Sequence, residues 1–179
     1  MKNPKDDAKM VDMALSRIVI REGSEQQYIY LQERGGGRGF PIVIGMNEAC
    51  EIRRVVAGLQ TQRPLTHQLT FETIRALGTE LKHVDIVDLR ENTFFAQIVL
   101  HKKEGELSAV VDARPSDAVA LALRANCPIR VAQSVLEMVR TDPAGPDPIP
   151  TGEEDAGPQE PGDPEKPPGE APEEDRETS

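Results

Sequence analysis

The C-terminal segment 141–179 limits what this chain can fold into more than any other feature of the sequence. It holds 10 of the 15 prolines and 13 of the 31 acidic residues, but only 2 of the 21 Lys and Arg. Its apolar side chains are few, namely Ala144, Ile149, Ala156 and Ala171. Such a segment buries too little apolar surface to offset its conformational entropy. We therefore expect 141–179 to be a disordered, acidic, proline-rich tail and the polar residues 1–10 to be a flexible N-terminus.

The charge of the chain is divided between these parts. The formal net charge is −10, but the tail carries −11, which leaves residues 1–140 at +1. A nearly neutral domain is compatible with nucleic acid or with other partners, so charge excludes little. Cys50 and Cys127 show no pairing pattern and indicate reduced thiols, which favours a cytoplasmic protein. The longest apolar run, 118–123, is too short to span a membrane, and residues 1–10 do not resemble a signal peptide.

Apolar periodicity divides residues 11–140 into strands and helices. Strands are predicted at 13–21, 28–33, 40–44, 81–89, 93–101 and 107–112, and helices at 47–59, 67–77, 115–125 and 132–140. Short turns at 91–92 and 104–105 predict antiparallel hairpins. Because hairpins outnumber strand–helix–strand units, we expect a single α+β domain at 11–140. It would contain a mixed, largely antiparallel sheet with three to four packed helices.

The helix predicted at 115–125 is apolar on every side. Pro115 suits its first position and Asn126 suits its end. An all-round apolar helix is typical of burial on more than one side. A domain of this size offers few layers to cover such a helix, so we expect a homo-oligomer, most simply a twofold dimer.

The most informative stretch is 112–118, Asp-Ala-Arg-Pro-Ser-Asp-Ala, where a predicted strand ends and this helix begins. It gathers the side chains of Asp112, Arg114, Ser116 and Asp117 beside the free N–H groups of a helix start. Such a junction can bind a phosphate through Arg114 and the N–H groups. It can equally hold a divalent cation through Asp112 and Asp117. The ordinary alternative is that Ser116 and Asp117 cap the helix while Asp112 pairs with Arg114.

A second polar cluster, Arg63, Thr66 and His67, precedes another predicted helix. His67 can take a proton from water near neutral pH, and Arg63 can neutralise a phosphate. The alternative is that Thr66 is an N-cap and His67 lies in an exposed first turn. His83 and His101 lie on predicted strands without ligand-like spacing, so we expect them to be structural and a zinc site to be absent.

Two nucleotide-binding patterns are not supported by the sequence. The glycine-rich run 35–39 lacks the Lys-Ser/Thr of a phosphate-binding loop and falls between strands, so we interpret it as a hairpin loop. The chain has four Phe, two Tyr and no Trp, so an aromatic platform that stacks several bases is poorly supplied.

Three segments together resemble a known family. They are 44–49 (IGMNEA), 63–67 (RPLTH) and 112–124 (DARPSDAVALALR). They are similar to the bifunctional nuclease domain family, formerly a conserved domain of unknown function, over about residues 11–140. The resemblance implies a self-associating α+β domain with RNase and DNase activity and therefore nucleic acid as its substrate.

The chain also departs from that pattern. Gln68 follows His67 where many relatives carry an acid, which removes a possible metal ligand or orienting partner. The net charge of +1 is low for a nucleic-acid binder, because affinity comes largely from neutralised phosphates. Convergence of Arg53, Arg54, Arg63 and Arg114 would compensate. The acidic tail stands where some relatives have an appended helical segment.

The leading hypothesis is a metal-assisted nuclease that hydrolyses phosphodiester bonds. Asp112 and Asp117 would hold Mg²⁺ or Mn²⁺, with Glu48 as a possible third carboxylate, and His67 would activate water. Arginine would stabilise the charged transition state. The residues expected to contact the substrate are Arg63, Thr66, Arg114 and Ser116.

Two alternatives remain at this point. One is a non-catalytic regulatory module that binds an anion or nucleic acid at the same junction. The other is a structural oligomer in which Asp112, Arg114 and Asp117 form a buried ion-pair network. An exposed cavity that joins Asp112, Asp117 and His67 would favour the enzyme, whereas burial of all three behind satisfied hydrogen bonds would favour the structural role.

Overall fold

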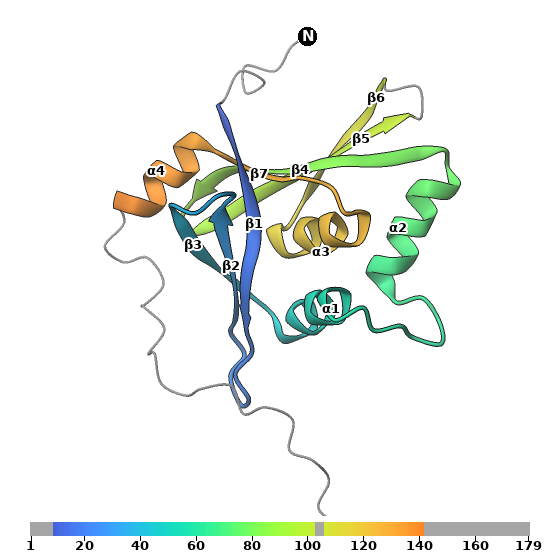
Figure 1. The fold of residues 1–179 in the computed structure, drawn as a ribbon, viewed down its shortest axis with the longest axis horizontal. Coiled ribbons are helices and arrows are strands. Elements are labelled where there is room, and N and C mark those ends of the chain that lie inside the picture. Colours follow the sequence, from blue (N-terminus) through green and yellow to red (C-terminus); the bar gives the residue numbers. More distant parts are fainter. Residues whose placement is uncertain (1–8, 103–105, 142–179) are drawn as a thin grey trace, which may run out of the picture. The chain divides into compact units, whose positions relative to one another are not determined.

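The computed structural model in Figure 1 describes residues 9–102 and 106–141. Within them the elements follow in the order β1 (Met10–Val19), β2 (Gln27–Glu33), β3 (Gly39–Ile44), α1 (Met46–Val56), α2 (Thr66–Ala76), β4 (Thr79–Arg90), β5 (Thr93–Lys102), β6 (Leu107–Ala113), α3 (Pro115–Ala125), β7 (Ile129–Ala132) and α4 (Gln133–Thr141). The tail and the N-terminal segment predicted above lie outside the described residues, except that Met10 begins β1 and Thr141 ends α4.

The strands form one seven-stranded sheet in the order β3-β2-β1-β7-β4-β5-β6. Neighbouring strands are antiparallel except β4 and β7, which are parallel. The expected α+β fold with a mixed, largely antiparallel sheet and four helices is therefore confirmed. The sequence patterns did not predict β7, which lies between β1 and β4 and joins the two sets of hairpin strands into one sheet.

The hairpin between β4 and β5 follows from its turn residues. Glu91 and Asn92 have φ values of 47° and 57°, and Arg90 pairs with Thr93 across the turn. A two-residue loop with two positive φ values matches the twist of the strands that it joins, and Asn adopts this conformation readily. The short turn predicted at 91–92 is thus confirmed, and it places Asn92 beside a cavity described below.

Helix α3 lies at the centre of the core. Seven of its residues are buried: Pro115, Ser116, Ala118, Val119, Ala120, Leu121 and Ala122. The helix contacts α1 and α2 as well as β4 and β5, so elements of the same chain cover its apolar sides. Asn126, with φ 51°, ends it as expected. The burial prediction is confirmed, but the reason given for a homo-oligomer no longer applies, and the dimer stays a prediction.

Two details at helix starts correct the sequence interpretation. Leu65, not Thr66, is the N-cap of α2, so Thr66 is the first helical residue and its side chain makes no cap hydrogen bond. Arg114 is the N-cap of α3, and that helix also lacks a side-chain cap. Ser116 and Asp117 are therefore not capping residues. Among the described residues, no helix combines the length and apolar character needed to cross a membrane.

Candidate functional site

The first turns of three helices meet in the candidate site. Glu48 lies in the first turn of α1, His67 is the second residue of α2, and Asp117 is the third residue of α3. Figure 1 shows these helices gathered together. The unpaired N–H groups at a helix start carry partial positive charge, so each start favours a nearby anion. The fold thus collects three such starts in one place.

Local sequence explains how two of these starts are formed. Gly45 is the N-cap of α1, and a Cβ atom there would collide with the Glu48 carboxylate. Pro115 is the first residue of α3, where a fixed φ and a missing N–H cost nothing. Pro115 therefore fixes the chain at the start of α3, while Gly45 leaves room for the Glu48 carboxylate that Arg114 contacts.

Arg114 links the polar side chains of α1 and α3. Its Nη2 donates to Glu48 Oε1 at 2.8 Å and to Asp117 Oδ1 at 3.1 Å, and its Nε donates to Asp117 Oδ2 at 2.8 Å. On the other side, His67 Nε2 lies 2.9 Å from Asp117 Oδ1. Asp117 is thus held by a bidentate arginine and by a histidine. This set of contacts replaces the simple pair of Asp112 with Arg114 that the sequence suggested.

The contacts fix the charges of the group. Burial raises the pKa of Asp117, but hydrogen bonds from Arg114 and His67 outweigh burial and bring this pKa below its ordinary value. Hydrogen bonds to Asp117 and Glu48 raise the pKa of Arg114 above its ordinary value. Asp117 is therefore an ionised carboxylate, which can only accept hydrogen bonds. His67 Nε2 must then carry a hydrogen, which it donates to Asp117. In neutral His67, Nδ1 is then the nitrogen that can accept a proton.

These side chains border a cavity of about 740 Å³ between the three helices and the strand end. The exposed fraction is 65% for the Arg114 side chain, 28% for Asp117, 19% for His67 and 16% for Glu48. The group is therefore accessible from the cavity and not sealed in the core. This exposure contradicts the fully buried network that the structural alternative required.

Asp112 borders the same cavity but does not join the group. Strand β6 pairs Asp112 with Gln97 and Val111 with Ile98. Ile98 belongs to the buried core and also lines the cavity under the helices. Because side chains alternate along a strand, the Asp112 side chain starts on the face of the sheet opposite to Ile98, and Asp112 borders the cavity only where β6 ends. Among the described residues, no hydrogen bond or ion pair joins Asp112 to the group around Arg114.

The predicted substrate-contacting residues are divided by the fold. Thr66 lines the same cavity as His67, at the start of α2. Ser116 is buried and lines a different cavity, on the other side of Arg114. Arg63 is exposed in the loop before α2 and lines neither of the two cavities.

The four arginines proposed to converge are also separated. Arg54 and Arg114 both line the cavity, but Arg54 is paired with Glu51. Arg53 borders another cavity, near β1. The four arginines therefore do not line one common cavity, and α1 directs Arg53 and Arg54 to different sides of the helix.

The described residues place few metal-ligating side chains together at the site. Within the described residues, no group of three or more His, Cys, Asp or Glu side chains is placed to hold a metal ion. Glu48 and Asp117 are brought together, but Arg114 occupies the space between their oxygens. Mg²⁺ is commonly held by one or two carboxylates together with water and substrate phosphates. Binding of Mg²⁺ or Mn²⁺ by Asp112 and Asp117, with Glu48 as a possible third ligand, therefore stays a prediction.

Comparison with known proteins identifies the family. Residues 29–143 match the family described as "Bifunctional nuclease domain", and this segment contains all three helix starts of the site. The chain belongs to the bifunctional nuclease domain family. The resemblance that was noted in the three sequence segments is thereby confirmed.

Individual relatives of this bifunctional nuclease domain differ in length. An uncharacterized protein of Mycobacterium tuberculosis is 41% identical over 127 residues, which is 71% of this chain and 74% of the relative. "Bifunctional nuclease 1" of Arabidopsis thaliana is 32% identical over 101 residues, 55% of this chain and 31% of the relative. "Bifunctional nuclease 2" of Oryza sativa subsp. japonica is 29% identical over 118 residues, 65% of this chain and 36% of the relative. The chain therefore spans about a third of the plant proteins.

Sequence reasoning missed Glu51 and Arg124, whose contact joins α1 to α3 in this bifunctional nuclease domain. Glu51 is buried in α1, and its two oxygens accept from Arg54 and from Arg124 of α3, each at 2.5 Å. The spacing of Glu51 and Arg54, three residues apart on a helix, is a visible signal for the first contact. Nothing in the sequence pairs Glu51 with Arg124, because that contact exists only once α1 packs on α3.

Proposed function

We propose that the cavity between α1, α2 and α3 binds a phosphodiester of RNA or DNA and hydrolyses it. The observation that carries the proposal is the hydrogen-bonded series His67–Asp117–Arg114 on the wall of an accessible cavity. A histidine oriented by a carboxylate is a general base, and an arginine beside it suits a phosphate. The family match and the names of the plant relatives support nucleic acid as the substrate class.

Each residue then has a defined role. Asp117 accepts the Nε2 hydrogen of His67 and keeps Nδ1 as the free acceptor nitrogen. His67 takes a proton from a water molecule as the water oxygen attacks phosphorus. The bond from phosphorus to the leaving sugar oxygen breaks, and that oxygen takes up a proton from solvent or from the protonated His67. Arg114 stabilises the charge that develops on the phosphoryl oxygens. Thr66, on the same wall, is a candidate hydrogen-bond donor to the substrate.

The charges of the site support a divalent cation in this proposal. With neutral His67, the carboxylates of Glu48 and Asp117 exceed the single positive charge of Arg114 by one. An incoming phosphate would be repelled unless further positive charge accompanies it. Glu48 and Asp117 are the residues that would hold Mg²⁺ or Mn²⁺, which would supply that charge at the phosphate.

The experiment uses the full-length protein and labelled single-stranded RNA and DNA. Cleavage is measured with Mg²⁺, with Mn²⁺ and with EDTA, for the wild type, His67→Gln and Asp117→Asn. Loss of a general base lowers the rate about 10²- to 10⁴-fold, so both variants are expected to fall into this range. His101→Gln, on β5 and outside the cavity lining, is the matched control and is expected to cleave normally. Equal cleavage by all four proteins would indicate a contaminating nuclease and refute the proposal.

A non-catalytic binding module is the second candidate, and one observation favours it. Both carboxylates beside Arg114 already accept hydrogen bonds from it, so the group is satisfied without a substrate. This candidate predicts that labelled RNA or DNA binds but stays intact under every metal condition. Binding without cleavage by the wild type would therefore select it over the enzyme.

A further inference from the structure

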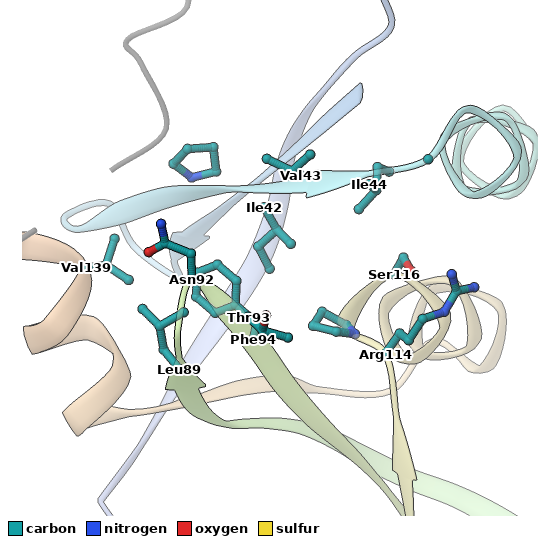
Figure 2. A pocket seen from close by; sticks show the side chains of 13 residues that line it. Ile42, Val43, Ile44, Leu89, Asn92, Thr93, Phe94, Arg114, Ser116 and Val139 are labelled. Carbon is teal, nitrogen blue, oxygen red and sulfur yellow. The ribbon is translucent and has the colours of Figure 1, made fainter. Parts of the chain in front are cut away.

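A second cavity lies next to the candidate site, between β3, the β4–β5 hairpin, the start of α3 and the C-terminal part of α4. Its volume is about 430 Å³, and most of its wall is apolar, with Ile42 and Ile44 from β3 facing Leu89 and Phe94 from the hairpin. Figure 2 shows Arg114 and Ser116 on the side opposite Leu89 and Val139. None of the roles proposed above uses this cavity.

Three polar side chains interrupt its apolar wall. Asn92 and Thr93 come from the hairpin, and Ser116 comes from the first turn of α3. Ser116 as a whole is only 6% exposed, and it lies in the cavity lining. A hydroxyl that opens into a cavity can donate to and accept from a polar ligand atom there. The N–H groups of the first turn of α3 are also unpaired within the helix.

Arg114 belongs to the lining of both cavities. A ligand whose anionic group lies at Arg114 therefore has the second cavity directly beside that group. The second cavity suits a flat apolar body with hydrogen-bonding edges, since apolar walls surround only a few polar groups. An alkyl chain offers the Ser116 hydroxyl no hydrogen-bond partner, whereas the edge of a nucleobase does.

Phe94 supplies a fixed ring for such a body. It stacks on Phe40 with ring centroids 5.4 Å apart and an interplanar angle of 24°. Phe40 is 2% exposed and anchored in the core, so the Phe94 ring is held in one orientation at the cavity wall. Aromatic rings held in this way are the usual stacking partners of unpaired bases. A single ring at the wall offers a stacking surface for one base.

From these observations we propose that the second cavity binds one nucleobase of a single-stranded nucleic acid whose phosphate lies at Arg114. This proposal rests on the proposed function and extends it to the form of the substrate. A base inside a duplex is stacked and paired, so it reaches the cavity only from a single strand, a loop or an opened end. The geometry therefore selects single strands over duplexes without requiring a particular base.

The test is a fluorescence-anisotropy titration of the full-length protein with three labelled ligands. These are a short single-stranded oligonucleotide, the same strand with abasic sites in place of its bases, and the duplex of the same sequence. Strand integrity is checked by gel electrophoresis after each titration. The intact single strand is expected to bind about tenfold more tightly than the abasic strand, which is the order of magnitude of one stacked base. The duplex is expected to resemble the abasic strand.

Two neighbouring residues provide a matched pair of variants. Phe94→Leu removes the ring at the cavity, whereas Phe95→Leu removes a ring on the same strand that does not line the cavity. Phe94→Leu is expected to lose most of the tenfold preference for the intact strand and to keep its affinity for the abasic strand. Phe95→Leu is expected to change neither. Ser116→Ala, which keeps the apolar wall, is the second test if Phe94→Leu does not fold in a thermal melt.

The outcomes separate the two proposals. If the wild type binds intact and abasic strands equally, or if Phe94→Leu and Phe95→Leu behave alike, the nucleobase cavity is refuted while the phosphate site stands. If the wild type binds none of the three ligands, the proposed function itself fails. Binding of a fatty acid such as dodecanoate that Phe94→Leu weakens, without any base preference, would also overturn the nucleobase assignment.

Discussion

Replacing Glu51 with Gln is expected to destabilise the domain more than other conservative changes of a charge in α1 or α2. The Glu51 side chain is 5% exposed and carries the only negative charge that contacts Arg54 or Arg124 among the described ion pairs. Both carboxylate oxygens accept a guanidinium hydrogen bond. An amide in the same place offers one oxygen, and its N–H₂ group faces a second donor. One arginine is therefore left without an acceptor.

The size of the effect follows from what remains buried. Breaking a buried ion pair costs about 3–5 kcal/mol, because the remaining charge stays out of water. Arg54 and Arg124 are 28% and 20% exposed, so water partly solvates the arginine that loses its partner. We therefore expect the lower end of the range, about 3 kcal/mol. Arg124 Nε is already buried without a partner, which makes Arg124 the arginine that tolerates the change least.

The assay is urea denaturation of the full-length protein at pH 7, with the midpoint and the slope fitted separately. The control is Glu72→Gln, since Glu72 is exposed on α2 and, within the described part of the chain, accepts a hydrogen bond from Gln68 one turn away. A contact of that kind contributes about 0.2–0.5 kcal/mol. A cost below about 1 kcal/mol for Glu51→Gln would refute the reasoning. It would show that apolar contacts of Ala49 and Ile52 alone hold α1 on α3.

Two further predictions follow from titratable groups outside the candidate site. Burial lowers the pKa of His83 below 6.5, against the opposing effect of Asp85. The unfolded chain then binds more protons, so the free energy of unfolding is expected to fall as pH drops below about 6.5. Denaturation of His83→Gln from pH 5 to 8 should show a smaller fall, and identical slopes would contradict this. Burial raises the pKa of Cys127 to about 11, so iodoacetamide should label it at pH 8 at least about tenfold more slowly than in urea-unfolded protein. Equal rates by mass spectrometry would show that the thiol is accessible and ordinary.

The elements of this fold could be predicted where they were long and bounded by turn or cap residues. Strands β4 and β5 have 12 and 10 residues on either side of a short turn, and α3 carries its apolar residues between a proline and an asparagine. Strand β7 failed this test because it has four residues, Ile129–Ala132, directly after Pro128. Its identity depends on pairing with β1 on one side and β4 on the other. Such pairing joins residues that are far apart in the sequence, so no local pattern reveals it.

The candidate site was predictable in its residue types but not in its partners. The sequence selected Glu48, His67, Arg114 and Asp117, and the structure brings these four into contact. The sequence also selected Asp112. Strand alternation was an available argument against this choice, because a residue next to a core-facing strand position faces away from the core. The contacts between α1, α2 and α3 depend on packing, so the link from Glu48 to Arg114 could not be derived from spacing alone.

The separation of Ser116 from Asp117 follows from helix geometry. It explains how the motif at 112–118 can contribute residues to two cavities. Successive residues of an α-helix are about 100° apart around its axis. Two adjacent residues of a first turn can therefore face different cavities, and in α3 Asp117 contacts His67 while Ser116 lines the cavity that contains Phe94. Arg114, just before the helix, reaches both cavities. One strand-to-helix junction thus presents a charged group to one cavity and a hydroxyl to the next, which is the arrangement on which the proposed phosphate site and nucleobase cavity rest.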